Sequence, residues 1–411
     1  MTAAKRDVVL LFITRFARMF AYGLVAIILV LYLTQIGFDE KTSGLLMSLT
    51  LAGDMLISLW MTTRADRIGR RKMLVAGAIL MTLAGLVFVS TNFFPLLMIA
   101  AIVGVISPSG NEIGPFLAIE QAAISEEITG SQRTHLFAYY NLMGSVATAL
   151  GALTAGWTVH WSERAGISAV QADRGILVAY AVIGLLLALI FSRLSPAVEP
   201  ATPQENRPNV FLGLHKSRGI VLKLSSLFAL DAFAGGFILQ SFLAYWFTVR
   251  FDIDPGVLGN VFFFANLFSG LSGLVAARLA DRIGLINTMV FTHIPSNILI
   301  MVVPLMPTFE WAMAALLARF AISQMDVPTR QSFVASVVAP DERSAAAGVT
   351  NIFRSCGAMF SPYLAGILLG SPATLSVPFF LAGGLKIVYD VALLLMFRQA
   401  ASAEETANVS S

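Results

Sequence analysis

The pentapeptide Ala-Asp-Arg-Ile-Gly occupies residues 65–69 and occurs again at residues 280–284. The first copy continues with Arg70, Arg71 and Lys72. Each copy lies between two long apolar segments, although only 12% of the 411 residues are charged. A charged turn that recurs between apolar segments indicates an internal repeat, with one copy of the turn in each half of the chain.

The composition is that of an integral membrane protein. Hydrophobic residues make up 57% of the chain, whereas soluble domains typically have about 45–50% apolar and about 25% charged residues. The formal net charge of +3 does not indicate a nucleic-acid partner, because the basic residues lie in short connections between apolar segments. The sequence has neither the Cys and His spacing of a zinc site nor a phosphate-binding Gly-Lys-Ser/Thr loop. We therefore expect no metal, no cofactor and no catalytic site.

Twelve apolar segments are long enough to cross a lipid bilayer as helices, since a span needs about 20 residues. Backbone polar groups in lipid must be satisfied within the segment, and no segment shows the alternation typical of a membrane β-barrel. The predicted spans are approximately residues 8–35, 42–63, 73–91, 95–117, 134–157, 175–195, 220–248, 256–278, 288–306, 309–330, 344–370 and 377–397.

The Lys and Arg residues predict the orientation of the chain. They concentrate before the first span and in every second connection after it, which is the pattern of cytoplasmic loops. We therefore expect a multi-pass protein with both termini in the cytoplasm. The membrane is expected to be a plasma membrane of the bacterial inner-membrane type.

Further matches between the two halves follow the same order. "FAYG" at residues 20–23 matches "FAGG" at residues 233–236, and Asn141 matches Asn351. A polar stretch rich in Pro separates the halves and is typical of a linker. The predicted organisation is a six-helix bundle over residues 1–196, a cytoplasmic linker over 197–218, a second six-helix bundle over 219–399 and a cytoplasmic tail over 400–411.

The turn, the repeat and the number of spans resemble the major facilitator superfamily. Its signature turn between the second and third helices reads Gly-x-x-x-Asp-Arg-x-Gly-Arg-Arg, and Thr62 stands here in place of the first Gly. The matching residues are Asp66, Arg67, Gly69, Arg70 and Arg71, and in the second copy Asp281, Arg282 and Gly284. The resemblance implies an all-α fold of twelve transmembrane helices in two pseudo-symmetric six-helix bundles. It also implies that the two turns form an inner gate. A purely topological anchor is the alternative, because basic residues are expected in any cytoplasmic loop.

Ionisable side chains inside the spans are costly and are by default functional. Lys386 and Asp390 lie four residues apart, so we expect them to pair on one helix face. The candidates for proton coupling or for lining the substrate cavity are Arg18, Glu112, Asp231, Asp326, Asn351 and Arg354.

Several of these residues have expected partners. Arg18 and Asp231 occupy matching positions in the two halves, on helices that line the cavity in the superfamily. We expect this cation and this acid to meet across the cavity in one state of the transporter. Arg354 is expected to pair with Asp326 or Asp231. Asp54 lies on a flanking helix and is expected to hold that helix to a neighbour.

Two of the acids lie beside helix-breaking residues. Glu112 is followed by Gly114 and Pro115, and Asp326 precedes Pro328 by two residues. A loosened helix frees backbone groups to line a cavity, and a desolvated carboxyl there holds a proton more readily. A fixed salt bridge that holds helices together is the alternative for each acid.

The sequence therefore predicts a secondary active transporter that works by alternating access, as proton-coupled efflux of amphipathic compounds. No nucleotide-binding motif is present, so an ion or solute gradient must drive transport. One alternative is an organic-anion or nutrient carrier, by symport or exchange, in which Arg18 and Arg354 bind a carboxylate or phosphate. Another is a non-transporting membrane sensor. We expect a small-molecule substrate, protons and the lipid bilayer as partners, a monomer, and no enzyme activity.

Overall fold

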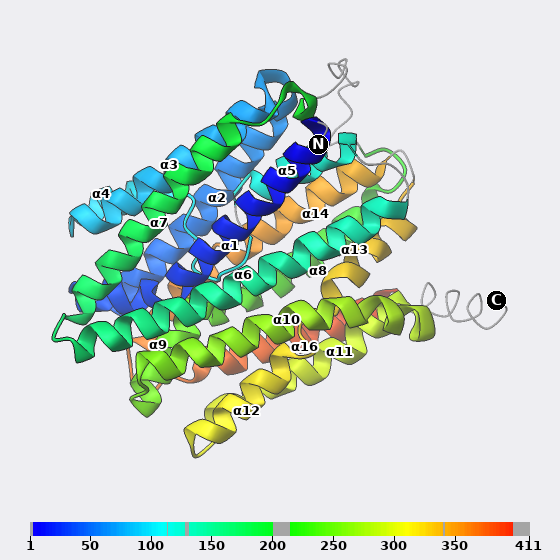
Figure 1. Ribbon diagram of the computed structural model, residues 1–411. Helices are drawn as coiled ribbons and strands as arrows, with labels where there is room; N and C mark the ends of the chain where they lie inside the picture. Colours follow the sequence, from blue (N-terminus) through cyan, green and yellow to red (C-terminus); the bar gives the residue numbers. More distant parts are fainter. Residues whose placement is uncertain (1–2, 113, 128–130, 200–213, 340–341, 398–411) are drawn as a thin grey trace. The chain divides into compact units, whose positions relative to one another are not determined.

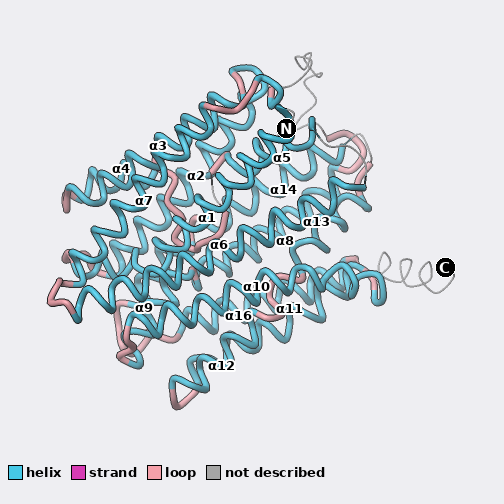
Figure 2. The backbone as a smooth tube through the Cα atoms, viewed as in Figure 1, coloured by secondary structure: helices cyan, strands magenta, loops and turns pink. Residues whose placement is uncertain are grey.

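The structure of the protein is a computed structural model that describes residues 3–112, 114–127, 131–199, 214–339 and 342–397. Every secondary-structure element in these ranges is a helix (Figures 1 and 2). The chain divides into two compact units. The first unit comprises Met1–Arg207 and Leu239–Phe263, and the second comprises Pro208–Ile238 and Phe264–Ser411.

In the first unit, the long helix α1 packs against both α6 and α7, while α3 packs along α7 and α2 along α4. Helix α9 also belongs to this unit and packs on α1. The elements are α1 (Ala3–Gln35), α2 (Glu40–Ile68), α3 (Arg70–Ser90), α4 (Phe94–Val103), α5 (Phe116–Glu127), α6 (Ser131–Arg164), α7 (Ala169–Ser192), the 3-10 turn η1 (Pro196–Val198), α9 (Gln240–Phe251) and the start of α10 (Pro255–Ile283).

In the second unit, α8 packs against α14 and α16, and α11 packs against α16. Apolar side chains such as Leu224, Phe228, Ile286 and Val290 form the buried core between these helices. The elements are α8 (Arg218–Gly235), the 3-10 turn η3 (Gly236–Ile238), the remainder of α10, α11 (Leu285–Val302), the 3-10 turn η4 (Val303–Leu305), α12 (Phe309–Phe320), α13 (Asp326–Val337), α14 (Arg343–Ala358), α15 (Ser361–Leu369) and α16 (Val377–Met396).

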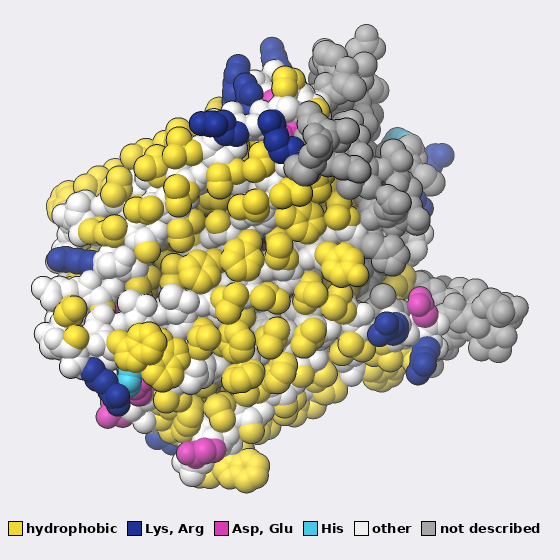
Figure 3. Space-filling view, in the orientation of Figure 1, with side chains coloured by type: hydrophobic (Ala, Val, Ile, Leu, Met, Phe, Trp, Pro, Cys, Tyr) yellow, Lys and Arg dark blue, Asp and Glu magenta, His cyan; other side chains and the backbone are white. Residues whose placement is uncertain are grey.

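Ten helical segments in the described ranges are long and apolar enough to cross a membrane. On the face shown in Figure 3, hydrophobic side chains form a broad surface and charged side chains gather towards its edges. Leu83 and Leu186 are examples of large apolar residues that remain half exposed. A surface of this kind is what a bilayer solvates. The prediction of an all-helical, multi-pass membrane protein is therefore confirmed.

Two of the twelve predicted spans contain no helical segment, among the described residues, that is long enough to cross a membrane. The span predicted over residues 95–117 ends as α4 at Val103 and resumes as α5 at Phe116. The span predicted over 309–330 is divided into α12 and α13 by a turn. In the first case Gly114 has a positive φ of 82° and Pro115 follows it. Neither backbone conformation can continue an α-helix.

The two copies of the repeated pentapeptide form the same local structure. Helix α2 ends at Gly69 with a φ of 119°, and α10 ends at Gly284 with a φ of 83°. In each copy the Gly N–H donates to the carbonyl of the residue four positions earlier, at 2.8 Å and 2.9 Å. A positive φ strains any residue with a side chain, so glycine is required at the point where one helix stops and the next begins.

Candidate functional site

The first unit contains a buried cluster of two arginines and two glutamates. The Arg18 guanidinium donates to Glu112 at 3.0 Å and to both oxygens of Glu120 at 2.7 Å. Both Arg18 and Glu120 are completely buried. The ring of Phe116 lies 4.4 Å from the guanidinium carbon. Burying these charges is tolerable because each one is paired and hydrogen-bonded.

Arg15 extends this cluster by one helical turn. Its three nitrogens donate to the Glu112 carboxylate at 2.6 Å, the Tyr140 carbonyl at 2.8 Å and the Asn141 amide oxygen at 3.3 Å. The Tyr140 hydroxyl donates in turn to Glu120 at 2.5 Å. Three helices, α1, α5 and α6, and the non-helical residues before α5 therefore meet in one closed network of hydrogen bonds.

Glu112 reaches this network because the chain is unwound around it. Residues 104–112 and 114–115 are non-helical, and Asp54 on α2 holds this stretch in place. The Asp54 carboxylate accepts the Gly114 N–H at 2.5 Å and the Ser58 hydroxyl at 3.1 Å. The helix break expected beside Glu112 is present, and Asp54 holds α2 to the broken segment.

The second unit contains a different buried cluster, centred on Asp231 of α8. One carboxylate oxygen lies 2.5 Å from the Lys386 ammonium of α16, and the other lies 3.2 Å from the Arg330 guanidinium of α13. Arg330 also contacts Asp326, one turn earlier on its own helix, at 3.1 Å. All four side chains are buried. Lys386 was expected to pair with Asp390 and does not, because its ammonium group extends to α8 instead.

Asp390 has partners of its own on α11. Its carboxylate lies 2.8 Å from His293 Nδ1 and accepts the Asn297 amide at 2.9 Å. The second ring nitrogen of His293, Nε2, lies 3.9 Å from Asp231. The imidazole of His293 therefore lies between the two carboxylates, in hydrogen-bond contact with Asp390 and beyond hydrogen-bond distance from Asp231.

The remaining candidate residues of the second unit have fewer hydrogen bonds and ion pairs among the described residues. Arg354 on α14 feels the charges of Asp231 and Asp326 but makes no hydrogen bond or ion pair among the described residues. The pairing predicted for Arg354 is therefore absent at contact distance. Asn351, one turn before it, is exposed. Arg319 on α12 has a buried Nε without a hydrogen-bond partner among the described residues.

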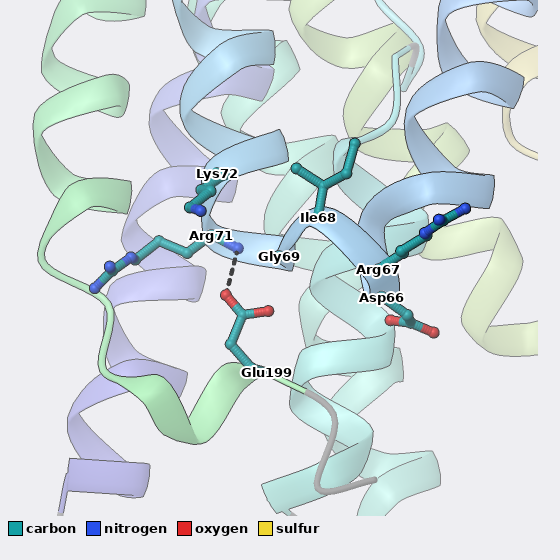
Figure 4. Close-up of a pocket in the computed structure, with 7 residues that line it drawn as sticks. All are labelled: Asp66, Arg67, Ile68, Gly69, Arg71, Lys72 and Glu199. Carbon is teal, nitrogen blue, oxygen red and sulfur yellow. Dashed lines mark hydrogen bonds between the residues drawn. The ribbon is translucent and has the colours of Figure 1, made fainter. Parts of the chain in front are cut away.

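The first copy of the turn is anchored by Glu199, an acid that directly follows the 3-10 turn η1. Arg70 pairs with Asp66 at 2.7 Å, while the backbone N–H groups of Arg70 and Arg71 donate to the Glu199 carboxylate at 2.6 Å and 3.2 Å. Figure 4 shows Glu199 beneath the N-terminus of α3. The side chain of Arg71 donates to the Leu194 carbonyl at 3.1 Å. The pocket at this turn is lined by Asp66, Arg67, Ile68, Gly69, Arg71, Lys72 and Glu199.

The second copy of the turn has no such anchor. Asp281 and Arg282 are exposed and form no ion pair with any described residue. Ile286, which stands where the first copy has a basic residue, is fully buried in the apolar core. The second turn is therefore held by packing and the first by charge.

An acid also caps the first helix of the second unit. Glu342 accepts the backbone N–H groups of His215, Lys216 and Ser217, the last two at 2.8 Å. Burial of the Glu342 carboxylate favours its neutral form, but these donors outweigh burial and lower its pKa to about 2. A carboxylate at a helix N-terminus satisfies the unpaired amides and the helix dipole together.

Sequence reasoning did not single out Arg330, Glu120 or Glu199 as partners in these clusters. Arg330 is the last residue of the span predicted over 309–330, and its spacing of four residues from Asp326 is a signal that could have identified the pair. Glu199 lies far along the sequence from the turn it anchors, and no local pattern connects the two.

The fold and the paired charges within its spans define a helical membrane transport protein. The chain belongs to the Major Facilitator Superfamily, whose family model matches residues 11–324 and 226–410. The predicted resemblance is confirmed. The family and the fold point to a transporter rather than an enzyme.

Three similar proteins illustrate the range of the family. The uncharacterized membrane protein YJR124C of Saccharomyces cerevisiae is 31% identical, over 96% of this chain and 94% of the yeast protein. The quinolone resistance protein NorA of Staphylococcus aureus is 21% identical, over 95% and 96%. The crystal structure of a mutant of the nucleoside transporter NupG superposes with a TM-score of 0.76 at 15% identity, over 95% of this chain and 100% of that one. This last likeness shows the fold alone.

Proposed function

We propose that the protein is a proton-coupled secondary transporter that exports small amphipathic molecules by alternating access, with Asp231 and Asp326 as coupling carboxylates. The observation that carries this proposal is the shared carboxylate of Asp231. Lys386 and Arg330 each hold one of its oxygens in a buried cluster. A proton that binds Asp231 removes the counter-charge of Lys386 and one of the two carboxylate partners of Arg330, which would shift the balance between conformations.

His293 gives the proton a route to Asp231. It lies between Asp390 and Asp231, and an imidazole is the side chain whose protonation changes most easily near neutral pH. The clusters of the first unit offer nothing comparable, since arginine does not give up its proton in proteins. We therefore assign proton coupling to the second unit.

The remaining parts of the proposal come from the family and the sequence. NorA, named for quinolone resistance, supports export of amphipathic compounds as the direction and substrate class. The distribution of Lys and Arg supports cytoplasmic termini in a plasma membrane of the bacterial inner-membrane type. Residues 1–196 and 219–399 are proposed as the two bundles that rock against each other, and one chain is proposed to suffice for transport.

The inner gate is proposed to consist of the two turns, with Asp66, Arg67, Gly69, Arg70 and Arg71 in one and Asp281, Arg282 and Gly284 in the other. Glu199 joins the first turn because it binds the backbone where α3 begins. An organic-anion or nutrient carrier is the second candidate function, and the incomplete surroundings of Arg354 favour it. A carrier of that kind would accumulate organic anions with the proton gradient rather than expel amphipathic compounds.

The test uses purified protein in liposomes with an imposed pH gradient, against a panel of lipophilic cations and organic anions. Asp231→Asn and Asp326→Asn should abolish accumulation driven by the gradient and retain substrate exchange without a gradient. Glu310→Gln, an exposed acid at the start of α12, is the matched control and should behave as the wild type. If both Asn variants keep full gradient-driven accumulation, the coupling proposal is wrong, and Glu112 becomes the next candidate.

A further inference from the structure

We propose that Arg354, supported by Arg319, binds an anionic group of the transported compound, a carboxylate or a phosphate. This inference rests on the proposed transport function and adds to it the charge of the substrate. An amphipathic compound would then place its acidic group in the second unit and its apolar body elsewhere in the pathway.

A charge inventory of the second unit supports this site. The cationic side chains within its spans outnumber the carboxylates, even when His293 is neutral. The cations are Arg319, Arg330, Arg354 and Lys386, and the carboxylates are Asp231, Asp326 and Asp390. The electric field of an excess positive charge inside a membrane protein attracts an anion.

The contacts show where the excess lies. Asp231 forms ion pairs with Lys386 and Arg330, and Asp326 forms an ion pair with Arg330. Among the described residues, Arg354 and Arg319 are left without an ion pair, and the Nε of Arg319 is also buried without a hydrogen bond.

Arg354 is not remote from the cluster. It lies within electrostatic range of Asp231 and Asp326, and the positive charge of Arg330 repels it. Arg319 is within range of the same two acids. Arg354 feels the cation Arg330 and has no ion-pair partner of its own among the described residues, which is costly for a guanidinium inside a membrane protein. A bound anion would remove that cost. The planar guanidinium binds a carboxylate or phosphate through two parallel hydrogen bonds, so it also selects the shape of the group.

The two buried arginines of the first unit differ from Arg354 in their hydrogen bonding. Every guanidinium nitrogen of Arg15 and Arg18 donates to an acceptor within the unit. A substrate anion at Arg18 would have to displace Glu112 or Glu120. The anion is therefore assigned to Arg354 rather than to Arg18, although the sequence favoured both equally.

The experiment compares two probes of equal shape and different charge, 2-naphthoate and the neutral 2-naphthamide, in equilibrium binding to the purified full-length protein. The wild type should bind naphthoate about tenfold more tightly or better, as expected for a hydrogen-bonded ion pair. Arg354→Gln should remove this preference and leave naphthamide binding unchanged. Arg319→Gln should reduce the preference by a smaller factor, and 2-naphthyl phosphate should follow the naphthoate.

Arg343→Gln is the matched control, since Arg343 is exposed on the same helix α14. If Arg354→Gln does not fold, Arg354→Lys is the substitute. It keeps the positive charge without the planar guanidinium, and it should retain only part of the preference for naphthoate. Equal binding of both probes by the wild type would overturn the inference, as would an unchanged preference in Arg354→Gln. A charge preference that depends on Arg354, found together with transport that ignores the pH gradient, would refute the coupling proposal and leave the anion site standing.

Discussion

The buried charges of the two units differ in kind, although each unit contains one copy of the repeated pentapeptide. The first unit pairs arginine with glutamate, and every guanidinium nitrogen of Arg15 and Arg18 has an acceptor. The second unit pairs Asp231 with a lysine and an arginine, places His293 beside it and leaves Arg354 without an ion pair among the described residues. The first cluster has all of its guanidinium nitrogens satisfied, and the second is the one to which we assign proton coupling and the anion site.

This difference indicates that the two buried clusters have different roles. A network whose members are all satisfied resists change, because breaking any one contact leaves a buried charge unpaired. A network with alternative partners of similar strength can switch between arrangements. We therefore interpret the first cluster as a structural brace and the second as the part that responds to ligands.

The largest expected effect comes from breaking the brace. Glu120→Ala leaves the guanidinium of the completely buried Arg18 with Glu112 alone. Loss of one partner of a buried ion pair typically costs about 3–5 kcal/mol. We expect a large fall in the thermal unfolding midpoint in detergent, with little folded protein recovered at 37 °C. Glu163→Gln, an exposed acid at the end of α6, should leave that midpoint unchanged. A stable Glu120→Ala protein would show that the brace is not structural.

The second cluster should tolerate paired substitutions better. We expect Asp231→Asn and Lys386→Gln each to destabilise the protein, and the double variant to lose less than the sum of the two. The coupling energy in a double-mutant cycle should be about 0.5–3 kcal/mol, as for residues in one network. Denaturant titration of the four proteins measures it. Additive effects would mean that the 2.5 Å contact between the two side chains contributes nothing to stability.

The fold could be predicted from the sequence because each part of it has a local signal. Apolar segments identify the spans, and Gly69 and Gly284 mark the ends of α2 and α10. The partners within the clusters could not be predicted, because a spacing of four residues suggested Lys386 with Asp390 while the tertiary packing of α8 against α16 brought Asp231 within reach. Long side chains bind whatever lies opposite them, and the sequence alone does not show what that is.

The two copies of the repeated turn, at residues 65–69 and 280–284, also differ in how they are held. Glu199→Gln removes the negative charge that binds the amides of Arg70 and Arg71. Loss of a charged cap at a helix N-terminus costs about 1 kcal/mol. We expect slower transport with nearly unchanged substrate affinity, measured as initial rates and equilibrium binding. Asp281→Asn removes the acid of the second copy and should have a weaker effect, because Asp281 is exposed and forms no ion pair with any described residue. Equal effects of the two substitutions would remove the distinction between the turns.

The smallest expected effect is confined to acid pH and concerns Glu342 of the second unit. Its pKa is about 2 in the folded protein and 4.5 in an unperturbed glutamate. Because the folded-state pKa is the lower one, the carboxylate stabilises the fold fully above pH 4.5, and this contribution is lost as the pH falls from 4.5 towards 2. Glu342→Gln should therefore lower the unfolding midpoint at pH 7 and flatten its pH dependence in that window. Glu163→Gln, which changes an exposed acid at the end of α6, should keep the wild-type pH dependence there. If Glu342→Gln and the wild type lose stability in parallel below pH 4.5, the cap of α8 does not depend on the charge of Glu342, and the neutral side chain suffices to bind the amides of Lys216 and Ser217.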